Sequence, residues 1–160
     1  MELKLSCREF TDNDYEEVLR LVQSFEDLFY MFPKADFPLT KEQLSRNVEN
    51  RPDSTVVLNG GEIVGFANFY EVEKEQYCSI GNVIVDSAFR GWNVGQYLIE
   101  AMERVAQQKY GVPEIHLSCF NTNTRGILLY DRLGYFPHKI EKRLDKNGLP
   151  IALIHMKKIL

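Results

Sequence analysis

Cysteine is scarce in this sequence, and its placement argues against two common kinds of small protein. The three cysteines, Cys7, Cys78 and Cys119, are odd in number and far apart. They match neither the paired spacings of a metal site nor a disulfide framework. Each cysteine lies in an apolar stretch typical of a strand, so we expect three buried free thiols and no bound metal.

Long apolar runs are also missing. A membrane-spanning helix needs about 20 consecutive apolar residues, and no run in this sequence approaches that length. Residues Met1–Lys4 do not begin a secretory signal peptide. We therefore expect a cytoplasmic protein that does not bind a membrane.

An excess of positive charge is absent as well. The 19 basic and 23 acidic residues give a formal net charge of −4. A nucleic-acid partner would favour a basic face, so this balance argues against one. An acidic surface instead favours cationic ligands such as amines.

The chain shows no internal repeat, low-complexity segment or linker. Hydrophobic residues make up 44% of it and charged residues 26%, which is ordinary for a soluble globular protein. A chain of 160 residues buries roughly 70% of the surface of its unfolded form. We therefore expect a single domain over residues 1–160.

Apolar periodicity and turn residues divide the chain into elements in the order β-α-α-β-β-β-α-β-α-β-β. We expect strands over 3–10, 54–58, 62–72, 77–85, 114–120, 135–144 and 151–159. We expect helices over about 15–25, 40–49, 94–110 and 125–133. Hairpin signals occur at Asn59–Gly61 and Asn147–Gly148. The order implies an α/β (α+β) fold with a mixed, mostly antiparallel sheet of about seven strands and helices on both faces.

The stretch 81–102 carries the clearest chemical signal. A β-branched run at Val83–Val85 leads into a loop over 90–95, and apolar residues at helical spacing follow from Val94. The start of a helix presents unpaired backbone N–H groups and the positive end of the helix dipole. Glycines allow a ligand to approach such a backbone closely. This arrangement predicts an anion site, most naturally for phosphates.

Two common phosphate loops do not fit the stretch. A P-loop requires G-x-x-x-x-G-K-[ST], but Gly95 is followed by Gln96 and Tyr97. The dinucleotide fingerprint G-x-G-x-x-G is absent. The segment Arg90-Gly91-Trp92-Asn93-Val94-Gly95 instead resembles the [RQ]-x-x-G-x-[GA] loop of the GNAT superfamily of acyl-CoA N-acyltransferases. Asn93 stands where that family usually has glycine, and asparagine tolerates a left-handed backbone better than most residues.

A second segment supports the same resemblance. Residues 123–135 are similar to the family's N-x-x-A-x-x-L-Y-x-x-x-G-[FY] motif. Gly126 stands where alanine is usual, and the matching positions are Asn123, Leu129, Tyr130, Gly134 and Tyr135. The two motifs come in the expected order with a strand between them. The order of elements also agrees with the family over nearly the whole chain.

The resemblance implies a binding site for acetyl-CoA. The sheet would open between the strands at 77–85 and 114–120, and the pantetheine arm would pair with the backbone of Val83 and Val85. The alternative is pairing of these strands along their length. The residues implied in coenzyme binding are Val83, Ile84, Val85, Arg90, Gly91, Trp92, Asn93, Val94, Gly95, Gln96, Asn123 and Tyr130.

The resemblance also implies a mechanism by direct attack. A neutral amine attacks the thioester carbonyl, a backbone N–H near Val85 stabilises the oxyanion, and the hydroxyl of Tyr130 protonates the leaving thiolate. Tyr130 is thus the implied catalytic residue, with a core tyrosine as the alternative. Asn123 could be only a helix N-cap, or it could cap the helix and bind the coenzyme at once.

The general base that would deprotonate the amine is not identified by the sequence. Candidates are Glu71, Glu73, Glu75, His116, His138 and His155. The glutamates are also typical of a solvated hairpin tip, and the histidines of a core or a surface. No Ser/His/Asp or Cys/His set can be assigned, because the sequence does not place these residues near one another.

Residues 25–38 are unusually aromatic. They contain seven large apolar side chains in fourteen residues, with Pro33 and Pro38 as helix breakers. The segment could be a lid over the hydrophobic core. It could also line the acceptor pocket, as the resemblance implies, through some of Phe29, Tyr30, Phe32 and Phe37. Such side chains bind amines by cation–π contact and favour loss of the ammonium charge.

Two hypotheses of function follow. The first is an N-acetyltransferase that moves an acetyl group from acetyl-CoA to a primary amine, either a small molecule or a peptide. The second is a non-catalytic module of the same fold that binds acyl-CoA as a sensor or interacts with another protein. The acceptor, the acyl-chain preference and the choice between a monomer and a homodimer stay open.

Overall fold

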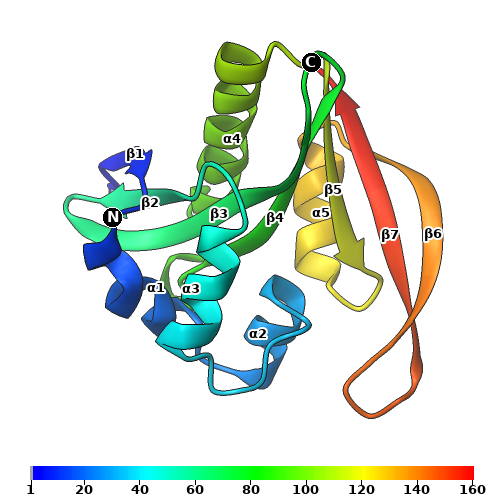
Figure 1. The fold of residues 1–160 in the computed structure, drawn as a ribbon, viewed down its shortest axis with the longest axis horizontal. Helices are drawn as coiled ribbons and strands as arrows, with labels where there is room; N and C mark the ends of the chain where they lie inside the picture. The colour runs from blue at the N-terminus through cyan, green and yellow to red at the C-terminus, as the bar shows by residue number, and fades with distance from the viewer. Residues whose placement is uncertain (1) are drawn as a thin grey trace.

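The computed structural model describes residues 2–160, which form one mixed sheet of seven strands with helices on both faces (Figure 1). The strands are β1 (Leu5–Glu9), β2 (Thr55–Asn59), β3 (Glu62–Glu73), β4 (Tyr77–Val85), β5 (Glu114–Phe120), β6 (Phe136–Leu144) and β7 (Pro150–Ile159). The helices are α1 (Tyr15–Leu21), α2 (Phe25–Met31), α3 (Lys41–Glu49), α4 (Val94–Tyr110) and α5 (Thr124–Arg132), with 3₁₀ turns η1 (Asp12–Asp14) and η2 (Ser87–Phe89). The predicted fold is confirmed.

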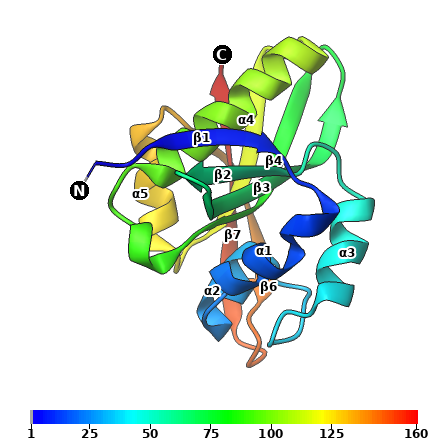
Figure 2. The ribbon, with the colours of Figure 1, turned by 90° about the vertical axis from the view of Figure 1, so that its left-hand side faces the viewer.

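The strands are arranged in the order β1-β2-β3-β4-β5-β7-β6. Every neighbouring pair is antiparallel except β4 and β5, which are parallel. Helices α4 and α5 cover one face, and α1, α2 and α3 cover part of the other (Figures 1 and 2). Each face therefore has its own buried core, one including Leu98 and Met102 of α4, the other Val18 of α1 and Leu44 of α3.

The sheet opens between β4 and β5. Only Tyr77–Ile80 of β4 pair with β5, opposite Glu114–Leu117. Beyond Ile80 and Leu117 the two strands share no ladder, so the backbone of β4 from Gly81 onward has a free edge on this side. This observation confirms the predicted opening and excludes pairing of the strands along their length.

A β-bulge shapes β4 where it leaves β5. Between the β3–β4 pairs Asn68–Gly81 and Phe66–Ile84, two residues of β4 face one residue of β3. Asn82 has a left-handed φ of 51° there. Its Nδ2 donates to the carbonyl of Met31 at 2.9 Å, and its Oδ1 accepts from Arg51 Nη1 at 2.7 Å. These hydrogen bonds tie the bulge to α2 and to the segment after α3.

Helix α2 was not predicted. The sequence pattern extends the first helix to Phe25, but α1 ends at Leu21 and a new helix starts after Ser24. The hydroxyl of Ser24 accepts from the N–H of Asp27 at 3.0 Å, and the Asp27 carboxylate accepts from the N–H of Gln23 at 3.1 Å. These two hydrogen bonds start a helix in the aromatic segment 25–38, for which the sequence pattern predicted none.

The prediction of three buried thiols is wrong for one cysteine. Cys78 and Cys119 are buried, and all three cysteines are free. Cys7 is exposed, because β1 is an edge strand and its burial pattern shows no residue enclosed on both faces. Alternation in the sequence located the strand, but its place at the edge of the sheet determines the exposure.

Candidate functional site

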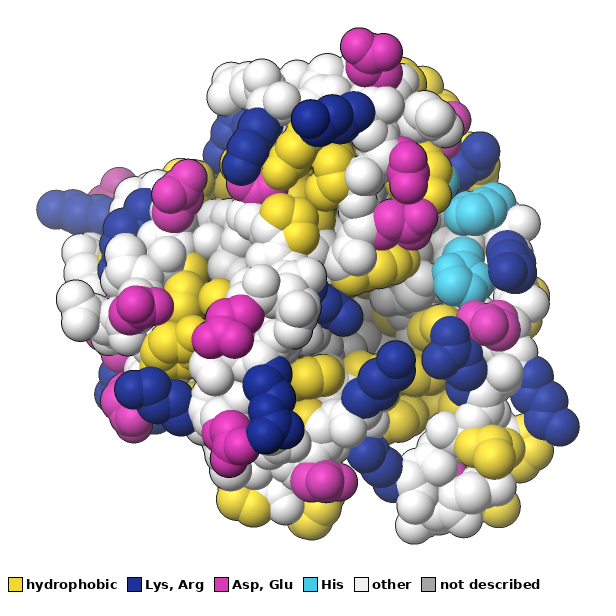
Figure 3. Space-filling view, in the orientation of Figure 1, with side chains coloured by type: hydrophobic (Ala, Val, Ile, Leu, Met, Phe, Trp, Pro, Cys, Tyr) yellow, Lys and Arg dark blue, Asp and Glu magenta, His cyan; other side chains and the backbone are white. Residues whose placement is uncertain are grey.

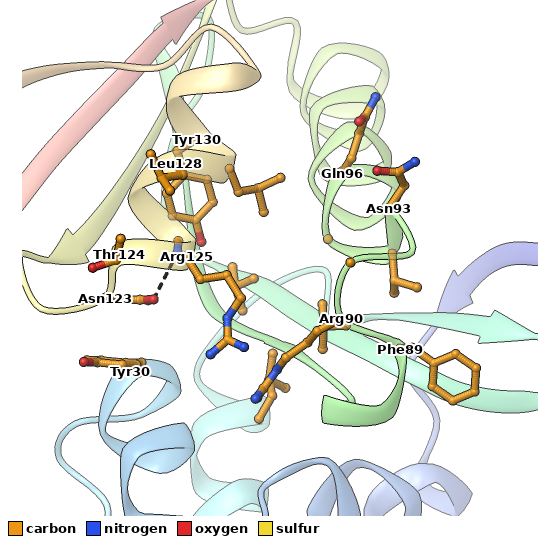
Figure 4. A pocket seen from close by; sticks show the side chains of 18 of the residues that line it. Tyr30, Phe89, Arg90, Asn93, Gln96, Asn123, Thr124, Arg125, Leu128 and Tyr130 are labelled. Atoms are coloured by element: carbon orange, nitrogen blue, oxygen red, sulfur yellow. Dashed lines mark hydrogen bonds between the residues drawn. The ribbon is translucent and has the colours of Figure 1, made fainter.

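A cavity of about 640 Å³ lies where the sheet opens. Its walls come from the end of β4, the loop after η2, the start of α4, the first turns of α5, and α2 (Figure 4). It is lined by Val83, Ile84, Val85, Arg90, Gly91, Asn93, Val94, Gly95, Gln96, Asn123 and Tyr130. The structure therefore brings together all of the predicted binding residues except Trp92, whose side chain is 43% exposed outside the cavity.

The loop before α4 exposes backbone donors to the cavity. Gly91 and Asn93 have φ values of 84° and 64°, so asparagine adopts the left-handed conformation expected at its position. The Asn93 side chain makes no capping hydrogen bond, and the first helical bond runs from Tyr97 N to Asn93 O. The N–H groups of Val94, Gly95 and Gln96 therefore have no partner within the helix, and they form the anion-binding geometry of a helix start.

Three arginines line the cavity, Arg90, Arg125 and Arg132, and the first two differ in character. Arg90 is paired with Asp27 of α2, with Nη2 and Oδ1 at 2.6 Å. Arg125 of α5 also lines the cavity, and within residues 2–160 it forms no salt bridge. Figure 4 shows the Arg125 side chain extending across the cavity toward Arg90. The first motif pointed to Arg90, whereas Arg125 lies in the second motif at a position where that motif specifies no residue.

Tyr130 lies on α5 with its ring in the cavity wall (Figure 4). The side chain is buried, and burial, followed by the nearby Cys119, raises the pKa of its phenol well above the ordinary value. Its hydroxyl has no hydrogen-bond partner among the described residues, yet it is not sealed from the cavity. Such a phenol remains protonated at neutral pH and can donate a proton to a group inside the cavity.

Asn123 caps α5 and lines the cavity at the same time. Its Oδ1 accepts from the N–H of Gly126 at 3.0 Å, so the alternatives left open by the sequence coexist. A Cβ atom at position 126 would lie 2.7 Å from Asn123 Nδ2 and 3.0 Å from Cys119 Sγ. This close packing explains why Gly126 stands at a position where the resembled motif has alanine.

Comparison with known proteins agrees with this geometry. The family model described as "Acetyltransferase (GNAT) family" matches residues 16–135. The chain belongs to the GNAT family. Among curated GNAT relatives, the spermine/spermidine N(1)-acetyltransferase of Bacillus subtilis is 28% identical over 94 residues. That match covers 55% of this chain and 60% of the relative, so it spans less than two thirds of the relative's length.

Solved structures with the same fold match nearly the whole GNAT chain. Spermidine N-acetyltransferase from Vibrio cholerae, solved with CoA and spermine, has a TM-score of 0.81 at 16% identity, covering 97% of this chain and 95% of that one. The ribosomal-protein-S18-alanine N-acetyltransferase from Escherichia coli has a TM-score of 0.76 at 19% identity, covering 98% and 94%. At these identities the likeness establishes the fold alone.

The candidates for a general base in this GNAT chain do not line the cavity. Glu71 and Glu73 end β3, and Glu75 lies in the turn that follows. Glu71 accepts a hydrogen bond from the hydroxyl of Tyr77 at 2.7 Å. The histidines are closer together than the sequence suggested, because the ring centroids of His116 and His138 lie 5.4 Å apart and those of His138 and His155 lie 6.4 Å apart.

The aromatic segment 25–38 contributes both to the hydrophobic core and to the cavity wall. Tyr30 lines the cavity, and its hydroxyl donates to Thr122 Oγ1 at 2.9 Å. Phe29 stacks on Phe120 at 4.6 Å between ring centroids, and Phe32 packs against the core under α1 and α3. Phe37 stacks on Phe25 at 4.4 Å, and both side chains are exposed. Only Tyr30 of the four named candidates lies in the cavity wall.

No helix within residues 2–160 has the length and apolar character needed to cross a membrane. The same residues contain no group of three or more His, Cys, Asp or Glu side chains that could hold a metal ion.

Proposed function

We propose that this GNAT protein transfers an acetyl group from acetyl-CoA to a primary amine by direct attack. The observation that supports the proposal best is the cavity itself. It begins at the free N–H groups at the start of α4 and follows the unpaired edge of β4, and the protonated phenol of Tyr130 stands in its wall.

The chain has the groups needed to hold acetyl-CoA. The N–H groups of Val94, Gly95 and Gln96, with Arg90 and Arg125, would bind the phosphates. The free edge of β4 offers backbone groups to the amides of the pantetheine arm, as in the addition of a strand. The twelve residues predicted from the motifs, and Arg125 in addition, are proposed as the coenzyme site.

The reaction balances without a covalent enzyme intermediate. The neutral amine nitrogen forms a bond to the thioester carbonyl carbon and gives up a proton to solvent, and the carbon–sulfur bond breaks. The thiolate takes a proton from the Tyr130 hydroxyl, which regains one from solvent. The acceptor is proposed to be a small-molecule or peptide amine. Polyamines are the first acceptors to test, because a spermine/spermidine N(1)-acetyltransferase and a spermidine N-acetyltransferase are among the similar proteins. A cytoplasmic location stays a prediction, and the choice between a monomer and a homodimer stays open.

A thiol-release assay tests the activity. The full chain is incubated with acetyl-CoA and, separately, spermidine, spermine, amino acids, an aminoglycoside and peptides with free N-termini. We expect thiol release with at least one amine. Binding of acetyl-CoA by calorimetry without turnover of any amine would favour the sensor hypothesis instead.

Replacing Tyr130 tests the role of its hydroxyl. Tyr130→Phe keeps the ring and its packing but removes the proton donor, so kcat should fall by roughly 10²-fold, a typical contribution of acid catalysis. The affinity for CoA should change by less than about twofold, because the phosphate contacts lie elsewhere. An unchanged kcat, with chemistry shown to be rate-limiting, would reduce Tyr130 to a packing residue.

A further inference from the structure

Ser118 occupies a special position on β5. It is the first residue of β5 beyond the segment that pairs with β4, so it lies where the sheet begins to open. Its neighbours Leu117 and Cys119 point into the core beneath α4 and α5. Because side chains alternate along a strand, Ser118 points to the opposite, more open face.

On that face Ser118 begins a chain of hydrogen bonds. Its Oγ lies 2.8 Å from Nδ1 of His155, the residue directly across on β7. His155 Nε2 lies 3.1 Å from Oε2 of Glu141 on β6, which also accepts from Arg143 at 2.9 Å. Histidine side chains gather on the β5–β7–β6 side of a hollow on this face (Figure 3). The sequence could not reveal this set, because its members are brought together only by the strand order β5-β7-β6.

The direction of these hydrogen bonds follows from their chemistry. Hydrogen bonds from Arg143 and then from His155 hold the pKa of Glu141 below its ordinary range, so Glu141 is an anion that only accepts. In neutral His155 the proton must therefore lie on Nε2, which leaves Nδ1 as an acceptor. The Ser118 hydroxyl must then donate to Nδ1. Its oxygen lone pairs remain available to a third group at the opening of the sheet.

We propose that Ser118 and His155 remove the proton from the acceptor amine, with Glu141 as the positioning residue. The inference rests on the proposed acetyl transfer. Before the amine attacks, its ammonium proton passes to Ser118 Oγ while the Ser118 proton passes to His155 Nδ1, which leaves a neutral amine with a free lone pair. The imidazolium formed is stabilised by Glu141 and releases its proton to solvent, which the 22% exposed side chain of His155 reaches. Tyr130 supplies its own proton to the thiolate from the other face.

Several ionisable side chains lie near His155 on the three strands of this face. On β5 they are Glu114 and His116, on β6 His138, Lys139, Glu141 and Arg143, and on β7 Lys157. Burial lowers the pKa of His138, and the charges of His116, Lys157 and His155 lower it further, so His138 adds little positive charge at neutral pH. Among the described carboxylates, only Glu141 is hydrogen-bonded to His155.

His116 provides a matched control. It lies on β5 two residues before Ser118, on the same face, and its Nε2 lies 2.9 Å from Glu114 Oε2. Its ring stacks on Tyr77 at 4.2 Å between centroids. His116 therefore resembles His155 in its carboxylate partner and partial burial, but it lies within the paired segment of β5 and has no serine partner among residues 2–160.

The experiment measures kcat/KM for the best amine at saturating acetyl-CoA between pH 6 and 10. His155→Gln and Ser118→Ala should each lower kcat/KM at pH 7 by roughly 10²-fold, the typical contribution of a general base. The loss should shrink as pH rises toward the pKa of the amine, because a deprotonated amine needs no base. Glu141→Gln should lower kcat/KM less. His116→Gln should stay within about twofold of the wild type.

The outcomes separate this inference from the proposed function. If wild-type protein turns over no amine, the acetyl transfer and the relay both fail. If wild-type protein is active but His155→Gln and Ser118→Ala keep its rate and pH profile, the relay alone is overturned. Circular dichroism shows whether each variant is folded. If His155→Gln fails to fold, Ser118→Ala still tests the relay, because it removes only the hydroxyl oxygen. An equal loss in His116→Gln would also overturn the relay, since it would indicate a general effect of this face.

Discussion

At the scale of single residues, the approach of α4 to α5 depends on Gly95. This glycine has no unusual backbone conformation, so its role is one of space. A Cβ atom there would lie 3.0 Å from Leu129 Cδ2 of α5 and 3.8 Å from Val85 Cγ2. A larger side chain would have to push the start of α4 away from the cavity that its N–H groups face.

Gly95→Val should therefore weaken coenzyme binding. We expect the Kd for CoA to rise at least about tenfold, which corresponds to about 1.4 kcal/mol, with calorimetry as the measurement. Gly61→Val is a matched control, because a Cβ atom at that hairpin glycine meets nothing within 4 Å. An unchanged Kd in Gly95→Val would show that phosphates bind elsewhere.

Asn93→Gly should be tolerated. The backbone at position 93 is left-handed, with a φ of 64°, and glycine adopts that conformation more freely than asparagine. The asparagine side chain makes no capping hydrogen bond that glycine would lose. Calorimetry should give a Kd for CoA equal to that of the wild type or lower. A marked loss of affinity would assign the Asn93 amide a direct role in binding.

At the scale of elements, the sequence was most informative where periodicity was strong. The strands at 77–85 and 114–120 have the predicted bounds, and α4 begins at Val94 as its apolar spacing indicates. Helix α2 was not predicted, because the two prolines and the many aromatic residues of this segment obscured the helical periodicity. Ser24 and Asp27 nevertheless form an N-cap pair that can be recognised in the sequence. The bulge at Asn82 and the Ser118–His155–Glu141 set depend on register and strand order, which no local pattern encodes.

Helix α2 connects the two sides of the opening. The carbonyl of Met31 accepts from Asn82 on β4, Phe29 stacks on Phe120 of β5, and the Tyr30 hydroxyl donates to Thr122. The helix therefore spans the gap that β4 and β5 leave between them. Its position makes it the element best placed to influence how an acceptor enters.

Tyr30→Ala should raise the KM of the amine severalfold and change the affinity for acetyl-CoA less. The substitution removes a ring from the cavity wall and the hydrogen bond to Thr122. Phe25→Ala serves as the control, because Phe25 lies on the same helix but is 71% exposed. Steady-state kinetics with each substrate varied in turn would measure both constants. Equal effects of the two substitutions on KM would mean that α2 acts only through packing.

At the scale of the whole molecule, the sheet consists of two parts joined by a short ladder. Strands β1–β4 form one part, strands β5–β7 form the other, and only Tyr77–Ile80 pair with Glu114–Leu117 between them. Helix α4 packs on β1–β4. The cavity at the junction forms because β4 and β5 lack backbone hydrogen bonds there. Other contacts must therefore hold the two parts together.

One such contact is a buried polar link from α4 to the second part. Glu103 of α4 is 9% exposed. Its Oε1 accepts from the hydroxyl of Tyr135 at 2.9 Å and from Nζ of Lys158 on β7 at 3.0 Å. The carboxylate is desolvated, so its stability in the folded protein depends on these two donors.

Lys158→Met should therefore destabilise the fold. Methionine keeps an apolar stem of similar length, but it leaves the Glu103 carboxylate with Tyr135 as its one partner. We expect the free energy of unfolding, measured by urea denaturation, to fall by about 1–3 kcal/mol, the cost of a buried charged group that loses a donor. Lys157→Met is the matched control on β7, since Lys157 lies 3.9 Å from Glu114 near the surface. If both variants were equally stable, α4 would be held to the second part by apolar packing alone. If only Lys158→Met were destabilised, the opening that forms the cavity would be balanced in part by a partly buried ion pair between α4 and β7.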